Sequence, residues 1–518
     1  MRRRDVLRSS AGALALAGLG GVASADDASY APRGEVAIEG AQEVATTPDG
    51  DFAAVAAGDG FALVDVSDAA SPSIVAERGE LLSDDEDGPM QMIADVKIDG
   101  DRLLVTGPNN PPRQGELVKA ALLYDITDPA NPERLDVLEV DHAIHNSFFA
   151  DGYAYLTVSD FEYEGFKTLD ASDGSLEVVS EYSIVDHDEK WQDVHGFLRS
   201  CHDLYVQDDV AYLAQWDAGT FMVDVSDPAN PEMLGRAGGL PADELSAVTR
   251  ENLGVVGLQP PGNSHYVRPD ADANYLYKGA ESWDANPDDD KRGASGITVF
   301  DISDVENPER LTTIHPPGAD DEGRRGQFTT SHNFDLRGDI LVSSWYYGGV
   351  MVHDVSDPAN PERLAWWRKP SETMFWGAKA AGDRDLFVAG NMQGSVMTFP
   401  MEAGEMADPP GAFTPPEETS LVTEIDWSKY TDGESTTSKS TTAAATTQPT
   451  TTEPTTAEPT TAEPTTAEPT TEMPETAMPT ETTDGSGPTP GFGALAAAGG
   501  IGIGAARLLA GDDEDAEE

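Results

Sequence analysis

The sequence contains little cysteine and little positive charge. Its 518 residues include a single cysteine, Cys201. An intramolecular disulfide is therefore excluded, and the fold must be stabilised by packing. Only 32 residues are lysine or arginine, against 94 aspartates and glutamates, so the formal net charge is −62. A surface this acidic repels polyanions, so nucleic acid and anionic membrane surfaces are poor partners, and no nucleic-acid partner is expected.

The excess of acidic residues has two interpretations. Repulsion between like charges is tolerable in concentrated salt, because the Debye length falls to about 3 Å at 1 M. The composition is therefore typical of a protein from a halophile. The alternative is a polyacidic surface that binds calcium, although the spacing of an EF-hand loop does not occur in the sequence.

The sequence also lacks the patterns of several large enzyme classes. Between about residues 35 and 399 it shows almost no helical periodicity. It contains no P-loop, no glycine-rich dinucleotide motif after a strand and no G-x-S-x-G elbow. Nucleotide-binding α/β folds and α/β-hydrolases are therefore disfavoured, and the catalytic residues of an enzyme are unknown at this stage.

What the sequence does have is a repeated strand-and-turn motif. Residues 349–364 read GVMVHDVSDPANPERL, and close copies occupy 121–135, 220–234 and 297–311. Looser copies occur at 61–74 and 166–176. Asp and Ser side chains accept hydrogen bonds from turn N–H groups, and prolines cannot donate to a β ladder. The motif thus predicts the end of one strand, a tight turn and the start of the next strand.

The spacing of the motif predicts an all-β propeller over residues 34–400. Each unit contains four strands within roughly 40–70 residues, which favours propeller blades over sandwich sheets. Seven units are predicted, although six or eight also fit the spacing. The last unit, residues 376–399, lacks a fourth strand, and the isolated strand at 35–38 is expected to complete it. The other six units are marked by Asp65, Asp125, Asp170, Asp224, Asp301 and Asp354.

The repeats resemble the LVIVD repeat family of secreted bacterial and archaeal proteins. The resemblance rests on the hydrophobic strand followed by D-x-S-D-P-x-N-P, which covers most of residues 35–399 in repeated form. It implies a propeller-like fold. It implies no particular activity, because propellers serve as binding modules and as enzymes.

The N-terminus predicts export. Residues 1–25 combine Arg3 and Arg4, a weakly apolar run and small residues before a cleavage site, as in a signal peptide. The order Arg-Arg-Asp-Val-Leu resembles a twin-arginine signal, and an ordinary secretory signal is the alternative. The export machinery is therefore an expected partner.

The C-terminal part predicts a stalk and a surface anchor. Residues 401–430 form an acidic connector, and 431–487 form a Thr/Pro/Glu-rich stalk that is expected to be disordered. Residues 488–518 contain Pro490, Gly491 and Phe492 before a short apolar segment. This resembles the PGF-CTERM signal of haloarchaeal surface proteins, which implies processing by an archaeosortase-like enzyme and anchoring at the cell surface. The tail is acidic here, whereas a basic tail is usual.

Four histidines occupy a recurring position. They are His145, His202, His265 and His332, and each opens the innermost strand of a unit. The imidazoles are therefore expected to converge at one mouth of the central channel. Glu43 lies near the equivalent place in the first unit. Imidazole is a common ligand of divalent transition metals. The alternative is a structural position at which each histidine bonds backbone groups. Four aromatic residues are expected near the same mouth, or else in the core: Trp216, Trp283, Trp345 and Trp376.

These features predict an exported, surface-anchored propeller that serves as a binding or scaffold module. Its partner would be a cell-envelope protein, a glycan or a small ligand that binds loops at one face. The alternative is a metal-dependent hydrolase or lyase that uses the histidine ring to activate water. A purely structural envelope component is the third interpretation.

Overall fold

A computed structural model describes residues 30–402, except for 86, 112–115, 261, 285–292, 320 and 322. The export signal with Arg3 and Arg4, all but two residues of the acidic connector, the stalk and the signal at Pro490–Phe492 lie outside the described residues. Within the described residues, no helix has the length and the apolar character needed to cross a membrane.

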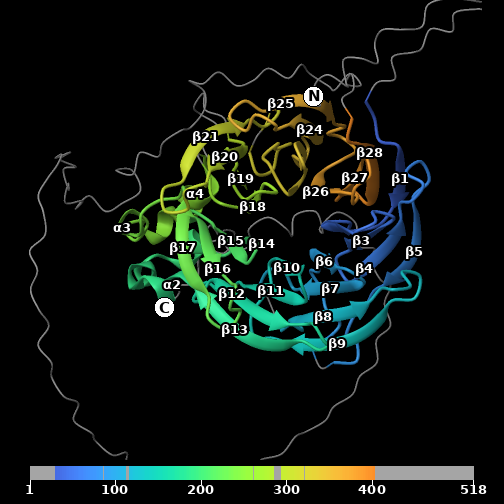
Figure 1. The fold of residues 1–518 in the computed structure, drawn as a ribbon, viewed down its shortest axis with the longest axis horizontal. Coiled ribbons are helices and arrows are strands. Elements are labelled where there is room, and N and C mark those ends of the chain that lie inside the picture. The colour runs from blue at the N-terminus through green and yellow to red at the C-terminus, as the bar shows by residue number, and fades with distance from the viewer. Residues whose placement is uncertain are drawn as a thin grey trace, which may run out of the picture. The chain divides into compact units, whose positions relative to one another are not determined.

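The described residues form a closed ring of seven four-stranded antiparallel sheets (Figure 1). This confirms seven blades rather than six or eight. In six blades the four strands follow one another in chain order from the axis to the rim. The strands near the middle of each blade are buried on both faces, because each blade packs face to face against its two neighbours.

The first three blades follow the strand-turn-strand order that the repeats predict. Blade 1 contains β2 (Val44–Thr46), β3 (Phe52–Ala56), β4 (Phe61–Asp65) and β5 (Ser73–Arg78). Blade 2 contains β6 (Asp95–Asp99), β7 (Arg102–Gly107), β8 (Ala120–Asp125) and β9 (Glu133–Glu139). Blade 3 contains β10 (Ser147–Ala150), β11 (Tyr153–Val158), β12 (Gly165–Asp170) and β13 (Glu177–Ser183).

The next three blades repeat this order. Blade 4 contains β14 (Asp203–Gln207), β15 (Val210–Gln215), β16 (Gly219–Asp224) and β17 (Glu232–Ala237). Blade 5 contains β18 (Tyr266–Pro269), β19 (Tyr275–Gly279), β20 (Ile297–Asp301) and β21 (Glu309–Ile314). Blade 6 contains β22 (Phe334–Arg337), β23 (Ile340–Ser344), β24 (Val350–Asp354) and β25 (Glu362–Trp367).

Blade 7 joins the two ends of the propeller. It contains β26 (Phe375–Ala380), β27 (Leu386–Asn391) and β28 (Ser395–Pro400), and its outer strand is β1 (Gly34–Ala37). β1 pairs antiparallel with β28, with Val36 opposite Val396. The buried Tyr30 hydroxyl donates to the Pro400 carbonyl at 2.8 Å. The predicted closure by the first strand is thus confirmed, and it leaves β28 without an open edge.

The repeated turns are held by the side chains that the motif predicts. Asp354 accepts a hydrogen bond from the Ser356 N–H at 2.9 Å, and Asp224 accepts one from Ser226 at 2.8 Å. The degenerate third unit also forms a complete blade, because Asp170 accepts both the N–H and the hydroxyl of Ser172. The carboxylate–serine contact is therefore sufficient for this turn, and the prolines are not required.

Short helices interrupt the all-β pattern in two insertions. The first contains α2 (Ile184–His187), η1 (Glu189–Asp193) and η2 (Gly196–Arg199); the second contains α3 (Ala242–Leu245), η3 (Arg250–Asn252) and α4 (Leu253–Leu258). Figure 1 shows α2, α3 and α4 beside blades 3 to 5. These helices could not be predicted from the sequence, because one or two turns produce no measurable periodicity.

The two faces of the ring differ in the length of their connections. The connections that enter the innermost strands and those that join second to third strands lie on one face, because the strands of a blade are antiparallel. On this face begin and end the longest connections, which join β13 to β14, β17 to β18, β19 to β20 and β21 to β22. The opposite face carries short turns such as 208–209 and 338–339 and the repeated Asp-Ser turns. We call the first the loop face and the second the turn face.

Candidate ligand and metal site

The loop face brings the four predicted histidines into one row. His145, His202, His265 and His332 precede the innermost strands of blades 3 to 6, so neighbouring blades place them side by side. The centroids of successive imidazole rings are 3.9, 4.1 and 4.5 Å apart. All four side chains are buried. The structure therefore gathers these residues at the channel mouth, while their role as metal ligands stays a prediction.

Backbone carbonyls fix the tautomer of three of these histidines. The Nδ1–H of His145 donates to the Asn109 carbonyl at 2.6 Å, and that of His332 donates to Trp376 at 2.5 Å. The Nδ1–H of His202 donates to the carbonyl of His265 at 3.2 Å. These are the contacts that the structural interpretation expects. They occupy only one ring nitrogen, however, so the lone pair on each Nε2 is left for a ligand.

Burial keeps the row neutral. It lowers the pKa of His145 to about 4 and that of His332 to about 3. It also lowers the pKa values of His202 and His265 well below the usual value. Neutral imidazole is the form that binds a metal ion, so no proton has to leave these side chains near pH 7 before binding.

Two of the four predicted tryptophans flank the row. The centroid of Trp216 is 5.0 Å from the ring of His202, and that of Trp376 is 4.2 Å from the ring of His332. Trp283 instead packs edge-on against Phe328 at 6.0 Å. Trp345 does not join the mouth and takes the alternative position in the core. Its indole donates to the Ser343 hydroxyl, and the ring fills the hydrophobic core of blades 5 and 6.

Glu281 is a site residue that sequence reasoning missed. Its Oε2 lies 3.7 Å from His265 Nε2, and both side chains are buried. The hydroxyl of Tyr346 donates to Oε1 at 2.5 Å. Burial raises the pKa of Glu281 to about 7, and the Tyr346 hydrogen bond opposes this rise. Glu281 follows β19 outside the repeated motif, so no pattern in the sequence pointed to it.

Glu43, the predicted carboxylate, has a different partner. Its Oε2 accepts a hydrogen bond from the Asn333 side chain at 2.7 Å. A Cβ added to Gly377 would lie only 3.0 Å from this oxygen, so a glycine there leaves room for the carboxylate. Glu43 thus borders the row beside His332, whereas the carboxylate that faces His265 is Glu281.

A layer of buried charges lies next to the row on the innermost strands. Lys97 pairs with Asp95, and Arg268 pairs with Asp335 at 2.8 Å. Although burial alone would lower the pKa of Lys97, the carboxylates of Asp95 and Glu43 raise it above its usual range. This layer compensates charge inside the ring, and its members lie on the innermost strands of blades 2, 5 and 6.

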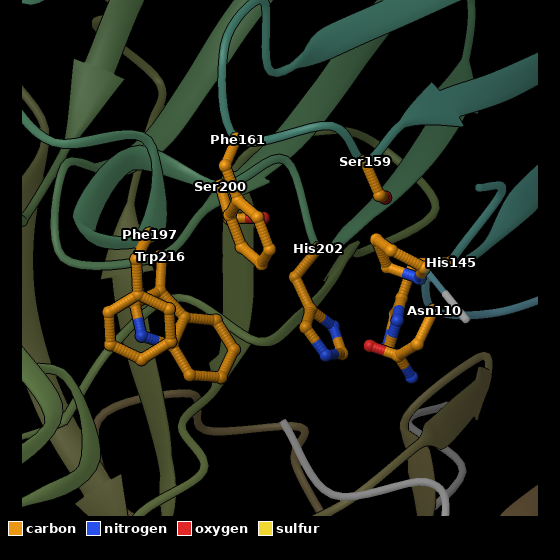
Figure 2. A pocket seen from close by; sticks show the side chains of 9 residues that line it. Asn110, His145, Ser159, Phe161, Phe197, Ser200, His202 and Trp216 are labelled. Carbon is orange, nitrogen blue, oxygen red and sulfur yellow. The ribbon is translucent and has the colours of Figure 1, made fainter. Parts of the chain in front are cut away.

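The described residues of the mouth line a small cavity (Figure 2). Its volume is about 40 Å³, and its lining includes His145, His202, Phe197 and Trp216. Phe197 belongs to η2 of the first insertion. A cavity of this size holds a few waters or an ion, because a drug-sized ligand needs roughly 300 Å³ or more.

Ring closure, blade number and the axial mouth define this chain as a seven-bladed β-propeller. The particular repeat is the LVIVD repeat, whose family model matches residues 41–77 and 199–237. These two stretches coincide with blades 1 and 4, from the segment before the innermost strand to the outermost strand. The predicted presence of LVIVD repeats is thus confirmed.

Comparison with solved structures finds a β-propeller domain and a designed protein among the similar chains. The β-propeller domain of Cps50 (Swd1) from Myceliophteria thermophila is 11% identical, with a TM-score of 0.46, and the match covers 71% of this chain and 99% of that one. The computationally designed Ika8 protein is 12% identical, with a TM-score of 0.41, and the match covers 70% and 98%. No curated protein matches the sequence.

Proposed function

We propose that this chain is an exported propeller, anchored at the cell surface of a halophile, that binds a cell-envelope protein, a glycan or a small ligand through its loop face. The observation that carries this proposal is the difference between the two faces. Long connections and the histidine row share one face, whereas the other is built from short repeated turns. Loops on a rigid scaffold are where binding residues concentrate.

Paired charge reversals test the binding face. Arg250 is exposed on the loop face, and Glu232 is exposed where β17 leaves a turn on the opposite face. Capture of envelope components by Arg250→Glu should fall relative to the unchanged chain, and Glu232→Arg should capture as well as the unchanged chain. Equal capture by all three proteins, or loss only in Glu232→Arg, would contradict binding through the loop face.

Cell fractionation tests export and anchoring. Replacing Arg3 and Arg4 together by lysine should retain the chain in the cytoplasm, since the twin-arginine pair is the predicted export signal. Replacing Pro490, Gly491 and Phe492 by alanine should leave the C-terminal segment uncleaved in mass spectra. Normal export of the first variant would reject the twin-arginine signal, and normal processing of the second would reject the sorting signal.

A second candidate function is a metal-dependent hydrolase or lyase. The pairing of imidazoles with the buried carboxylate Glu281 favours it, because this ligand chemistry suits a metal that activates water. Turnover of ester or glycoside substrates that stops on chelation and returns with added metal would support this candidate. Saturable binding without turnover would favour the binding module.

A further inference from the structure

Three potential ligand atoms meet on the loop face near the axis. They belong to His202, His265 and Glu281, lie within 4.8 Å of one another, and come from buried side chains. His202 and His265 enter the innermost strands of blades 4 and 5, and Glu281 follows the second strand of blade 5. Two adjacent blades thus supply two imidazoles and one carboxylate to a single place.

Outer contacts orient two of the three groups. His202 donates its Nδ1–H to the His265 carbonyl, so its Nε2 keeps a free lone pair. The Tyr346 hydroxyl holds Glu281 Oε1, and the Glu281 backbone N–H donates to the Asn263 side-chain oxygen at 2.8 Å. The other carboxylate oxygen, Oε2, remains directed at His265. Such outer hydrogen bonds are what fix the orientation of metal ligands in proteins.

One ring nitrogen of His265 lacks a hydrogen-bond partner among the described residues. This nitrogen is its buried Nδ1. Its Nε2 lies 3.7 Å from Glu281 Oε2, which is too long for a hydrogen bond. A buried polar atom without a partner costs about 1–3 kcal/mol, and such groups call for an explanation such as a bound ion. A cation held between His265 Nε2 and Glu281 Oε2 would give these two facing atoms a partner.

We propose that His202, His265 and Glu281 bind one divalent transition-metal ion of the zinc class. Two imidazoles and a carboxylate are a ligand set that such ions accept, with a fourth position left for water. Bonds of about 2.1 Å place tetrahedral ligand atoms about 3.4 Å apart, so the most distant pair has to approach by up to about 1.4 Å. His202 also borders the 40 Å³ cavity beside His145, which has room for that water.

The metal site goes beyond the proposed binding role and can be tested without a partner. The full chain is stripped with a chelator, dialysed and titrated with Co²⁺, whose visible absorption reports coordination by nitrogen and oxygen. We expect one ion per chain, displaced by Zn²⁺. X-ray absorption of the zinc form should show two imidazoles among the ligands. No stoichiometric binding of Co²⁺ or Zn²⁺ by the folded wild-type chain would overturn the proposal.

Variants test the ligand set. His265→Asn and Glu281→Gln should each weaken Co²⁺ binding by about 100-fold or more, and Tyr346→Phe by about 10–100-fold as the loss of an outer contact. Glu164→Gln is the matched control, because Glu164 is also a buried carboxylate but bonds the Phe161 and Cys201 N–H groups. It should bind Co²⁺ normally.

Two further variants separate this set from a four-histidine site. His145→Asn and His332→Asn should retain Co²⁺ binding. Loss of binding in both, with full binding in Glu281→Gln, would overturn the assignment. Circular dichroism checks that each variant is folded, and the X-ray absorption of the wild type decides the ligands if a variant does not fold. Because no envelope component enters these assays, failure of the metal site leaves the binding proposal standing, and the reverse also holds.

Discussion

At the scale of single residues, His353 is an unusual member of the repeat. It precedes the signature aspartate of blade 6, at a position where blades 1, 4 and 5 carry Val64, Val223 and Phe300. Its side chain is buried in β24 opposite Arg363. Burial, together with the charge of Arg363, lowers the pKa of His353 to about 3. The folded chain therefore excludes a proton that the unfolded chain accepts.

His353 should make the protein less stable in acid. The pKa of an unfolded histidine is about 6.5, so stability is lost as pH falls from there towards 3. At pH 5 the loss from this one group is about 2 kcal/mol. In His353→Phe this loss should be absent, so the stability of the variant relative to wild type should rise by that amount between pH 8 and pH 5. Chemical denaturation at both pH values measures it, and an unchanged difference would contradict the assignment.

Lys97 offers a second prediction at this scale. It compensates the buried Asp95, and replacing it by methionine leaves that carboxylate without its charged partner. The expected cost is about 3–5 kcal/mol of unfolding free energy. The control is Lys190→Met, which breaks the exposed pair with Asp188 and should cost less than about 1 kcal/mol. Similar costs in the two variants would mean that the axial charge layer does not stabilise the ring.

At the scale of elements, the most consequential strand is β1. It is the one strand that blade 7 receives from the other end of the described chain, and Tyr30 just before it adds a buried aromatic side chain. Deleting residues 26–38 from a chain without its signal should reduce stability by at least about 3 kcal/mol, the cost of losing one large buried side chain. The bare edge of β28 should then promote aggregation.

Complementation provides the control for this deletion. A synthetic peptide of residues 28–40 added to the shortened chain should restore the melting temperature, because an extended peptide can add to a free sheet edge. The chain that lacks only residues 1–25 should melt as a closed ring. A shortened chain that is monomeric and melts at the same temperature would show that β1 does not close the propeller.

Most elements could be predicted from the sequence because the repeat encodes them. The Asp-Ser turns recur at a fixed distance from apolar strands. Because the last unit lacks a fourth strand, the strand at residues 35–38 could be predicted to complete it. The helical turns of 184–199 and 242–258 could not be predicted, since they are held by tertiary burial of residues such as Trp191 and Leu253 rather than by a local pattern.

At the scale of the whole molecule, charge sets the response to salt. With a net charge of −62, repulsion between carboxylates should destabilise the folded state when salt is dilute. The melting temperature should rise steeply as the Debye length falls from about 30 Å at 0.01 M to about 10 Å at 0.1 M, and more slowly beyond. A rise that is linear in salt over the whole range would indicate salting-out rather than screening.

Only the histidines of the candidate site could be predicted from the sequence, because they occupy a repeated position. The four histidines share one position in the repeat, so closing the ring predicts that they meet. Glu281 and Tyr346 come from connections between second and third strands, whose length and course differ from blade to blade. Their meeting with His265 depends on the packing of blade 5 against blade 6, and no spacing in the sequence encodes it.

The meeting of Tyr30 and Pro400 at blade 7 means that the propeller has no obligatory starting point. A circular permutant that joins these ends and opens the chain between Pro129 and Ala130 would keep every strand beside its present neighbours. Blade 2 would then be the composite blade, with β9 supplied by the new N-terminus. Such a permutant would move the two ends of the propeller chain from blade 7 to blade 2 and leave the row of imidazoles in place.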